Sequence, residues 1–231
     1  MVFFVPDIAT CHLLPEEEAQ HAIKVLRLKA GDEIRLTDGN GSFYDAEISG
    51  IHGKSCEFRI TRKTEVPRRN FRLHIAIAPT KNIDRLEWFV EKAVEIGIDE
   101  ITPILCQCSE RKVLKEERLE KIVISAMKQS LKAYRTQLNP LCSVKEVITN
   151  NNYTQKFIAH CDSDTDKILL KNICQKAADT LILIGPEGDF SQEEIALAKA
   201  NGFRAISLGE SRLRTETAGI VACHTVDLIN E

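Results

Sequence analysis

The stretch "LILIGPEGDFSQEEIALAKANGFRAISLG", residues 181–209, predicts a strand, a loop, a helix and a second strand in succession. Its four aliphatic residues stop at a glycine, which is typical of a buried strand that runs into a loop. Ser191 and Glu194 form an S-x-x-E capping box, which predicts that a helix begins there. We therefore expect strands at 180–184 and 204–208 and a helix at 191–201.

The same alternation extends back to residue 71. "FRLHIAIAP" alternates as a strand does, and "DRLEWFVEKAVEIG" is an amphipathic helix that stops at Gly97. Strands separated by helices of about 10 to 15 residues predict a mostly parallel α/β sheet. The apolar face of the helix in "DRLEWFVEKAVEIG" holds Leu86, Phe89, Val90, Ala93 and Val94. Further strands are expected at 100–105 and 156–160, and further helices at 116–134, near 166–178 and at 215–229.

The first 70 residues have a different pattern. Short alternating β-segments surround the turn "DGNG" at 38–41, which predicts a small hairpin-rich barrel or sheet. One helix is expected in "PEEEAQHAIKVLRL", because acidic residues open it and basic residues close it. Pro67 and the arginines around it mark a boundary. We therefore expect a domain at 1–70 and an α/β domain at 71–231.

Composition narrows the class of protein. The chain has 231 residues, 43% of them hydrophobic and 28% charged, which is ordinary for a globular protein. Its apolar stretches are shorter than the roughly 18 residues that cross a bilayer, and the N-terminus lacks a secretory signal, which favours the cytoplasm. The eight cysteines are scattered without zinc spacing, so we expect reduced thiols and no metal.

The loop after the strand at 180–184 is a candidate ligand site. Gly185 and Gly188 permit either close approach to a ligand or positive φ, although a plain strand-to-helix connection would also use them. The spacing is neither G-x-G-x-x-G nor a P-loop, and Glu187 would repel a pyrophosphate. A neutral or cationic ligand with hydroxyls and an adenine-like edge suits this loop better.

A second break, "ISLGESRLRTETAG" at 206–219, has the same architecture. Gly209 ends the strand, and Thr215 or Thr217 can cap the last helix. We expect Arg212 to be solvated and Arg214 to be functional.

A basic strip, "RITRKTEVPRRNFR" at 59–72, stands out in a chain whose net charge is −3. It is either a contact for a polyanion or a solvated linker whose charges prevent aggregation, and the sequence favours neither.

Taken in order, these segments resemble the RsmE-type methyltransferases of the SPOUT class over essentially the whole chain. The resemblance rests on "HAIKVLRLKAGDEI", "DGNG", "EKAVEIGIDEITPI", "SERK", "AMKQS", "IGPEGDFSQEEI" and "LGESRLRTETA". It implies a C-terminal α/β domain with a deep trefoil knot and a PUA-like RNA-binding β-barrel before it. It also implies a homodimer that uses S-adenosylmethionine to methylate N3 of a uridine in small-subunit (16S) ribosomal RNA, in an assembled or partly assembled particle.

The resemblance also assigns residues. The implied cofactor site consists of His160, Ile184, Gly185, Pro186, Glu187, Gly188, Leu208, Gly209, Leu213, Arg214 and Thr217. From the chemistry of uridine N3 we hypothesise that Arg111 or Arg214 stabilises the anion and that Glu216 or Glu187 accepts the proton. RNA binding is expected at His21, Lys24, Arg27, Arg68 and Arg69.

Two departures and two rival functions accompany this interpretation. Relatives usually carry glycine where Asp189 stands, and Lys132 or Arg135 takes the place of an arginine that follows "AMKQS" more closely. A nicotinamide oxidoreductase would need a glycine-rich first βα turn, which "IAIAPTKNIDR" does not offer. A non-catalytic RNA-binding protein on the same scaffold is the remaining alternative.

Overall fold

A computed structural model describes residues 2–161 and 167–231, which form two compact units. The first unit contains residues 1–68 and 124–135, and the second contains 69–123 and 136–231. The split lies close to the expected boundary at residue 70. The segment 124–135 was not expected to belong with the first unit.

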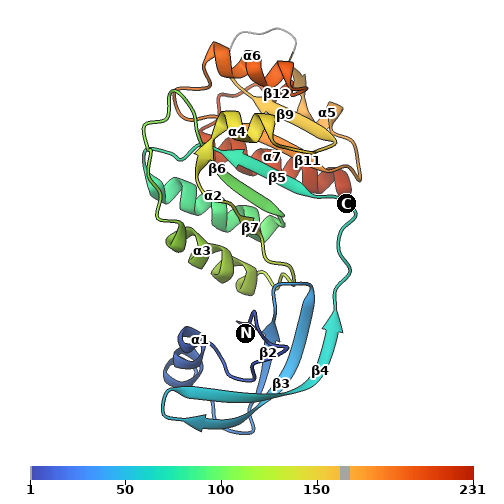
Figure 1. The fold of residues 1–231 in the computed structure, drawn as a ribbon. Helices are drawn as coiled ribbons and strands as arrows, with labels where there is room; N and C mark the ends of the chain where they lie inside the picture. Colours follow the sequence, from blue (N-terminus) through green and yellow to red (C-terminus); the bar gives the residue numbers. More distant parts are fainter. Residues whose placement is uncertain (1, 162–166) are drawn as a thin grey trace. The chain divides into compact units, whose positions relative to one another are not determined.

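The first unit is built on a four-stranded sheet in the order β1-β2-β3-β4 (Figure 1). β1 runs parallel to β2, and the other neighbours are antiparallel. Beyond β1, the chain also hydrogen-bonds to β4, from Leu14 N–H to Cys56 C=O at 2.9 Å and from Phe58 N–H to His12 C=O at 3.0 Å. The N-terminal stretch therefore borders both edges of the sheet, which gives a barrel-like closure. The elements are β1 Val2–Phe4, helix α1 Glu16–Gln20 continued by a π-helical turn His21–Val25, β2 Glu33–Thr37, β3 Ser42–His52 and β4 Ser55–Glu65.

The turn between β2 and β3 confirms the hairpin predicted around "DGNG". Asp38 accepts hydrogen bonds from Asn40 N–H at 2.7 Å and Ser42 N–H at 3.1 Å, and the Tyr44 hydroxyl donates to it at 3.0 Å. Gly39 and Gly41 take positive φ, and a Cβ on Gly41 would lie 2.5 Å from the Tyr134 ring. The turn therefore requires a small residue where segment 124–135 packs.

The second unit is a parallel sheet in the order β10-β12-β9-β11-β5-β6-β7, with β8 also paired to β6. This confirms the predicted α/β class. The strands are β5 Leu73–Ile77, β6 Glu100–Leu105, β7 Gln137–Leu138, β8 Cys142–Ser143, β9 Gln155–Ala159, β10 Ile168–Leu169, β11 Thr180–Ile184 and β12 Arg204–Ser207.

Helices cover both faces of this sheet (Figure 1). Val147 of α4 and Ile195 of α6 share one buried cluster with Leu181 and Leu183 of β11. On the other face, α7 packs against α2 so closely that a Cβ on Gly219 would lie 2.5 Å from the Phe89 ring. The helices are α2 Ile83–Ile96, α3 Glu116–Gln129, α4 Val144–Thr149, α5 Leu170–Ile173, α6 Gln192–Ala200 and α7 Thr215–Asn230.

Two predicted helices are shorter than expected. The helix predicted to reach residue 134 ends at Gln129, because Leu131 takes a φ of 54° and turns the chain. The helix predicted near 166–178 is the single turn α5, and residue 166 lies outside the described residues. After α5 the Gln155 side chain binds the Gln175 carbonyl at 3.0 Å, which stabilises an irregular path.

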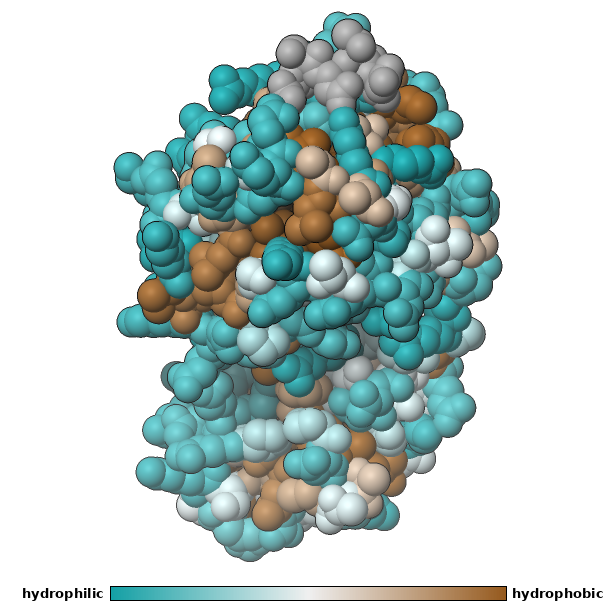
Figure 2. All heavy atoms as spheres, turned by 45° about the horizontal axis from the view of Figure 1, so that its top comes forward, coloured by the Kyte–Doolittle hydropathy of each residue, from teal (hydrophilic) through white to brown (hydrophobic). Residues whose placement is uncertain are grey.

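On the face drawn in Figure 2 most side chains are hydrophilic, and hydrophobic side chains form a band among them. Trp88 on α2 is 45% exposed and Leu228 on α7 is 58% exposed. Within the described ranges, we find no helix with the length and hydropathy of a membrane span.

Candidate functional site

The candidate site lies at the carboxyl ends of three neighbouring strands. β9 lies between β12 and β11, although it precedes both in sequence. The loop after β11 and the loop after β12 therefore stand on either side of the residues that follow β9. Ligands commonly bind at this edge of open α/β sheets.

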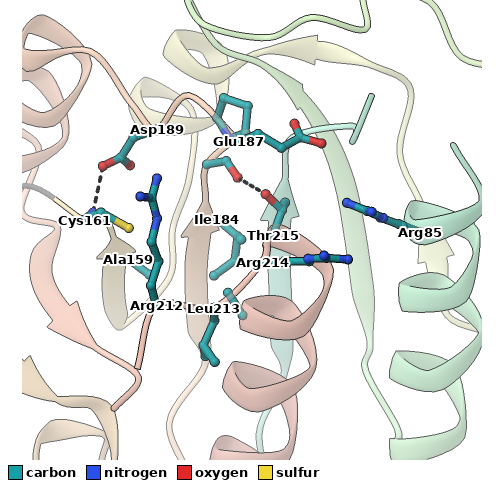
Figure 3. A pocket seen from close by; sticks show the side chains of 13 residues that line it. Arg85, Ala159, Cys161, Ile184, Glu187, Asp189, Arg212, Leu213, Arg214 and Thr215 are labelled. Carbon is teal, nitrogen blue, oxygen red and sulfur yellow. Dashed lines mark hydrogen bonds between the residues drawn. The ribbon is translucent and has the colours of Figure 1, made fainter. Parts of the chain in front are cut away.

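A cavity of about 360 Å³ opens beside the loop after β11 (Figure 3). Its walls combine an apolar floor with a charged mouth. The residues that line it are Arg85, Ala159, Cys161, Ile184, Gly185, Pro186, Glu187, Asp189, Arg212, Leu213, Arg214, Thr215 and Ala218. We call it the first cavity.

A second cavity, of about 420 Å³, adjoins it beside the loop after β12. Fewer charged groups line it, and much of its wall is the turn at 207–211. The two cavities share one wall, made of Ala159, Cys161, Arg212, Leu213 and Ala218. The residues that only the second cavity adds are His160, Lys167, Ile206, Ser207, Leu208, Gly209, Glu210 and Ser211.

The glycines of the loop after β11 serve close packing. A Cβ on Gly185 would lie 3.0 Å from the Phe190 ring, and one on Gly188 would lie 3.0 Å from the Cys108 Cβ. Positive φ falls instead on Asp189, at 66°. Its carboxylate accepts hydrogen bonds from Cys161 N–H at 2.7 Å and from Phe190 N–H at 2.9 Å, which stabilises a conformation that disfavours most side chains.

The two helices that begin at this edge start differently. Ser191 and Glu194 form the predicted capping box at the start of α6. At α7, neither Thr215 nor Thr217 caps the helix, so that prediction was wrong. The Thr215 hydroxyl donates to the Gly185 carbonyl at 3.0 Å (Figure 3), and within the described part of the chain the start of α7 has no side-chain cap. The first N–H groups of α7 thus remain available beside the first cavity.

Arginines dominate the charge of the first cavity. Arg212 and Arg214 form no ion pair with any of the described residues, and both are exposed. Arg85 pairs only loosely, with its Nε 3.8 Å from Glu216 Oε1. Of the acidic groups there, Glu187 accepts from Lys81 N–H at 3.0 Å, and Asp189 is held by backbone N–H groups. The cavity therefore favours an anion at its arginine-lined side.

Arg111 lines neither cavity, so the direct role expected for it stays a prediction. Its Nε donates to the Thr80 carbonyl at 3.1 Å, and an NH₂ group donates to the Lys81 carbonyl at 2.7 Å. Those carbonyls belong to the loop between β5 and α2. Arg111 therefore holds the loop that leads to Arg85.

Most of the expected cofactor residues do meet at the two cavities, and the exceptions are informative. Gly188 and Thr217 lie outside both linings, and Ala218 takes the place expected for Thr217. Arg212, expected to be merely solvated, lines both cavities. Gly209 has a φ of 140° with open space around its Cα, so its conformation calls for glycine. The expected residues that line a cavity are His160, Ile184, Gly185, Pro186, Glu187, Leu208, Gly209, Leu213 and Arg214.

Arg85, Cys161 and Ala218 were missed by the sequence analysis. Arg85 could have been found, because it lies in the first turn of the helix that follows β5, at the same edge of the sheet as the glycine loops. The other two carry no sequence signal of their own.

Most of the basic strip at 59–72 is paired with neighbouring carboxylates, which reduces the free positive charge that it offers to a polyanion. Carboxylates of the first unit pair with Arg59, Arg62 and Lys63. Arg69 binds Asp99 at 2.7 Å, Asp227 at 3.3 Å and the Gly97 carbonyl, so its charge is already shared, and its role in RNA binding stays a prediction. Arg68 stacks over the Tyr134 ring at 5.4 Å and meets no carboxylate among the described residues.

The helix of the first unit keeps its expected cations at the surface. Lys24 and Arg27 are exposed, and His21 is partly exposed. Arg27 has a φ of 55° and ends the helical segment. Lys132 and Arg135, between which the sequence could not choose, both lie in the segment 124–135 of this unit.

The amino edge of the same sheet holds a contrasting polar cluster. Glu100 accepts hydrogen bonds from Arg72 at 2.8 Å, Tyr153 at 2.6 Å and Asn139 at 2.7 Å. His74 Nε2 lies 2.7 Å from the Thr102 hydroxyl, and burial lowers the pKa of His74 to about 4.

The acidities in this cluster follow from burial and pairing. Burial raises the pKa of the Tyr153 hydroxyl, and its hydrogen bond to Glu100 raises it further. Burial also acts to raise the pKa of Glu100, but the groups around the carboxylate outweigh burial and lower it. We call Arg72, His74, Glu100, Asn139 and Tyr153 the amino-edge cluster.

Comparison with known proteins gives one consistent result. Residues 67–227 match the family model described as the RNA methyltransferase domain, and residues 14–61 match the RNA methyltransferase PUA domain. The chain is 33% identical over 204 residues to ribosomal RNA small subunit methyltransferase E of Mesomycoplasma hyopneumoniae, a match that covers 86% of each protein.

Solved structures agree. A probable rRNA-methyltransferase from Porphyromonas gingivalis is 45% identical, with a TM-score of 0.94 over 99% of this chain and 98% of that chain. A ribosomal RNA small subunit methyltransferase E from Neisseria gonorrhoeae, bound to S-adenosyl methionine, is 25% identical. Its TM-score is 0.85 over 99% of this chain and 97% of its own.

Proposed function

We propose, since this chain belongs to the RNA methyltransferase family, that it transfers a methyl group from S-adenosylmethionine to N3 of a uridine in small-subunit (16S) ribosomal RNA. One observation carries the proposal. Two adjoining cavities at the carboxyl edge of the sheet share a wall, so two ligands can meet there. A methyl donor and its target base require such an arrangement, because positioning two reactants in line supplies much of the catalysis.

The second cavity suits the nucleoside part of the cofactor. Its turn at 207–211 presents backbone groups from Leu208 and Gly209, and few charged side chains. The sulfonium methyl would then lie near the shared wall, beside Leu213 and Ala218. His160 borders this cavity, whereas Ile184, Gly185 and Pro186 border the first cavity and complete the binding site.

The first cavity suits the target uracil. N3 of uridine carries a proton at neutral pH, so it must lose that proton before it attacks the methyl group. A cation at the uracil oxygens stabilises the resulting anion, and one well-aimed donor is worth roughly 10²- to 10³-fold in rate. Arg214, which lines this cavity and makes no ion pair in the described part of the chain, meets that requirement.

The first unit would bind the RNA outside the reacting base. Lys24, Arg27 and Arg68 are exposed cations, His21 lies with Lys24 on the turn His21–Val25, and Arg27 follows that turn. With few aromatic side chains at the surface, contacts to phosphates and to RNA shape would dominate. Binding should therefore weaken steeply as salt rises, and an assembled or partly assembled particle would supply the folded RNA.

Family membership further supports a deep trefoil knot, formed by the loops after β11 and β12, and a homodimer. Exposed Trp88 of α2 and Leu228 of α7 offer apolar surface for a second copy. A ribosomal RNA substrate places the reaction in the cytoplasm.

Mass mapping of ribosomal RNA from a deletion strain tests the activity, the base and the position together. We expect one uridine of the small-subunit RNA to lose a methyl group at N3, and the purified chain to restore it. A non-catalytic RNA-binding protein would leave the methylation pattern unchanged, and that result would overturn the proposal.

A further inference from the structure

We propose that Arg85 is a catalytic residue that stabilises the uracil anion, and that Glu216 is the positioning residue that aims it. This inference rests on the proposed function, and it gives Glu216 a different role from proton acceptor. It follows from the elements that carry the two side chains and from the way their neighbours are engaged.

Arg85 projects into the first cavity from outside the glycine loops. It lies in the first turn of α2, after Asn82, whose side chain caps that helix. Its guanidinium points toward Arg214 and Thr215 (Figure 3), and it lines the cavity with 38% of its side chain exposed. A ligand in the cavity can therefore reach it directly.

Glu216 is suited to orient this guanidinium. It follows Thr215 in the first turn of α7, and its side chain is only 10% exposed. Its Oε1 lies 3.8 Å from Arg85 Nε, and no described residue pairs with the NH₂ groups of Arg85, so they can bind a ligand. A buried carboxylate that faces a guanidinium is better placed to hold it than to take up a proton.

The acidic groups next to Arg85 in the first turns of α2 do not compete for it. Glu87 pairs with Arg118 at 2.6 Å, and Asp84 lies 4.0 Å from the same arginine. The acidic group nearest to Arg85 is therefore Glu216 of α7 and not a carboxylate of α2.

The neighbouring cations are less suited to the reacting base. Arg111 is held by the Thr80 and Lys81 carbonyls. Lys81 pairs with Glu110 at 2.9 Å. Arg212 lies on the wall shared with the second cavity, nearer the cofactor. Arg85 and Arg214 remain, both in the lining of the first cavity, beside the start of α7, which has no side-chain cap among the described residues and whose N–H groups also favour negative charge.

The chemical step balances without a further reactant. The N3 proton passes to Glu187, whose carboxylate is exposed at the cavity mouth, and from there to solvent. The negative charge spreads onto the uracil oxygens, where Arg85 stabilises it. The N3 lone pair then forms the bond to the methyl carbon while the sulfur–carbon bond breaks, so that anion and sulfonium both become neutral.

Single-turnover methylation at saturating RNA and cofactor, measured from pH 6 to pH 10, tests this role with Arg85→Ala, Arg85→Lys and the control Lys92→Ala. We expect Arg85→Ala to slow the reaction by roughly 10²- to 10³-fold, because one anion stabiliser is lost. Its rate should keep rising to a higher pH than that of the wild type, since N3 is harder to deprotonate. Arg85→Lys and added guanidinium should each restore part of the rate, and Lys92→Ala on the same helix should behave as wild type.

Glu216→Gln separates positioning from proton transfer. If Glu216 aims Arg85, the variant should lose less rate than Arg85→Ala and shift its pH profile in the same direction. A rate that no longer rises with pH in the variant would identify Glu216 as the base and overturn the assignment.

Arg85 could instead bind the carboxylate of the cofactor or a phosphate of the RNA, and each alternative gives a distinct result. A tenfold loss of S-adenosylmethionine affinity in Arg85→Ala would assign the arginine to the cofactor carboxylate. A changed KM for RNA and a smaller salt dependence, with an unshifted pH profile, would assign it to a phosphate. Either result overturns the inference while wild-type methylation stands, whereas a wild-type chain that methylates no RNA would overturn the proposed function itself.

Discussion

The two edges of the parallel sheet carry similar polar residues but use them differently. At the amino edge, Glu100 accepts hydrogen bonds from Arg72, Tyr153 and Asn139. At the carboxyl edge, Arg212 and Arg214 line a cavity without an ion pair to any described residue. The same chemistry therefore stabilises the fold at one edge and remains available to a ligand at the other.

The two edges differ because different kinds of chain segment adjoin the strands there. At the amino edge, short connections bring side chains of β5, β6 and the segment before β9 together, so they satisfy one another. At the carboxyl edge, the loops after β11 and β12 border two cavities, and α7 begins without a side-chain cap among the described residues. Arg212 and Arg214 there are exposed to solvent, so they need no partner in the protein and remain available to an anionic ligand.

The largest expected effect is on stability, at the amino edge. Glu100→Ala removes the acceptor shared by three donors, and we expect a loss of about 3 kcal/mol in the free energy of unfolding, moderated because Arg72 is half-exposed. Urea denaturation followed by circular dichroism measures it. Glu100→Gln keeps one acceptor and should lose less, and equal losses in the two variants would contradict this account of the cluster.

The pH dependence of stability is the next largest effect. Burial lowers the pKa of His74 to about 4, below the value of about 6.5 in an unfolded chain. The unfolded state therefore binds this proton more tightly, and stability should fall as pH drops from 6.5 toward 4, by about 2 to 3 kcal/mol at pH 4.5. Urea denaturation at pH 7 and pH 4.5 should show this loss of unfolding free energy in the wild type, and His74→Gln should lack the part that comes from His74.

At the carboxyl edge, Gly209→Ala should destabilise by about 1 to 2 kcal/mol. A φ of 140° disfavours an L side chain even though the space around Gly209 is open. Thermal unfolding measures the loss, and Gly53→Ala serves as a control for positive φ in the first unit. We expect only Gly209→Ala to weaken cofactor binding as well. An unchanged affinity for the cofactor in this variant would mean that the turn at 207–211 does not contribute to the binding site.

Asp189→Gly should have the smallest effect. Glycine relieves the positive φ, but it removes the acceptor for the Cys161 and Phe190 N–H groups. The two changes oppose each other, so unfolding free energy should change by less than about 1 kcal/mol. Asp189→Asn keeps an acceptor and tolerates this backbone. A large loss in both variants would mean that the negative charge itself is needed.

Local patterns predicted the sheet and much of the site. The capping box at Ser191, the helix end at Gly97 and the strand at 180–184 depend on neighbouring residues, and all three are confirmed. The two glycine loops lie near each other because β9 lies between their strands. The alternation of strands and helices in the sequence predicts a parallel sheet but not this strand order.

Long-range contacts explain what the sequence analysis missed. The strip at 59–72 pairs with carboxylates as distant as Asp227, and segment 124–135 joins a unit more than 50 residues earlier in the chain. Arg85 reaches the cavity because α2 packs beside α7, which no local pattern encodes.

Calorimetric titration of S-adenosylmethionine into the wild type, Ala218→Phe and Glu100→Gln tests most directly the claim that chemistry belongs to the carboxyl edge. Ala218 lies on the wall that both cavities share, so a phenylalanine there fills the space where donor and target meet. We predict one bound cofactor per chain in the wild type, unchanged affinity in Glu100→Gln, and at least about a tenfold loss, ~1.4 kcal/mol, in Ala218→Phe. Full binding by Ala218→Phe, or no binding by the wild type, would contradict the account.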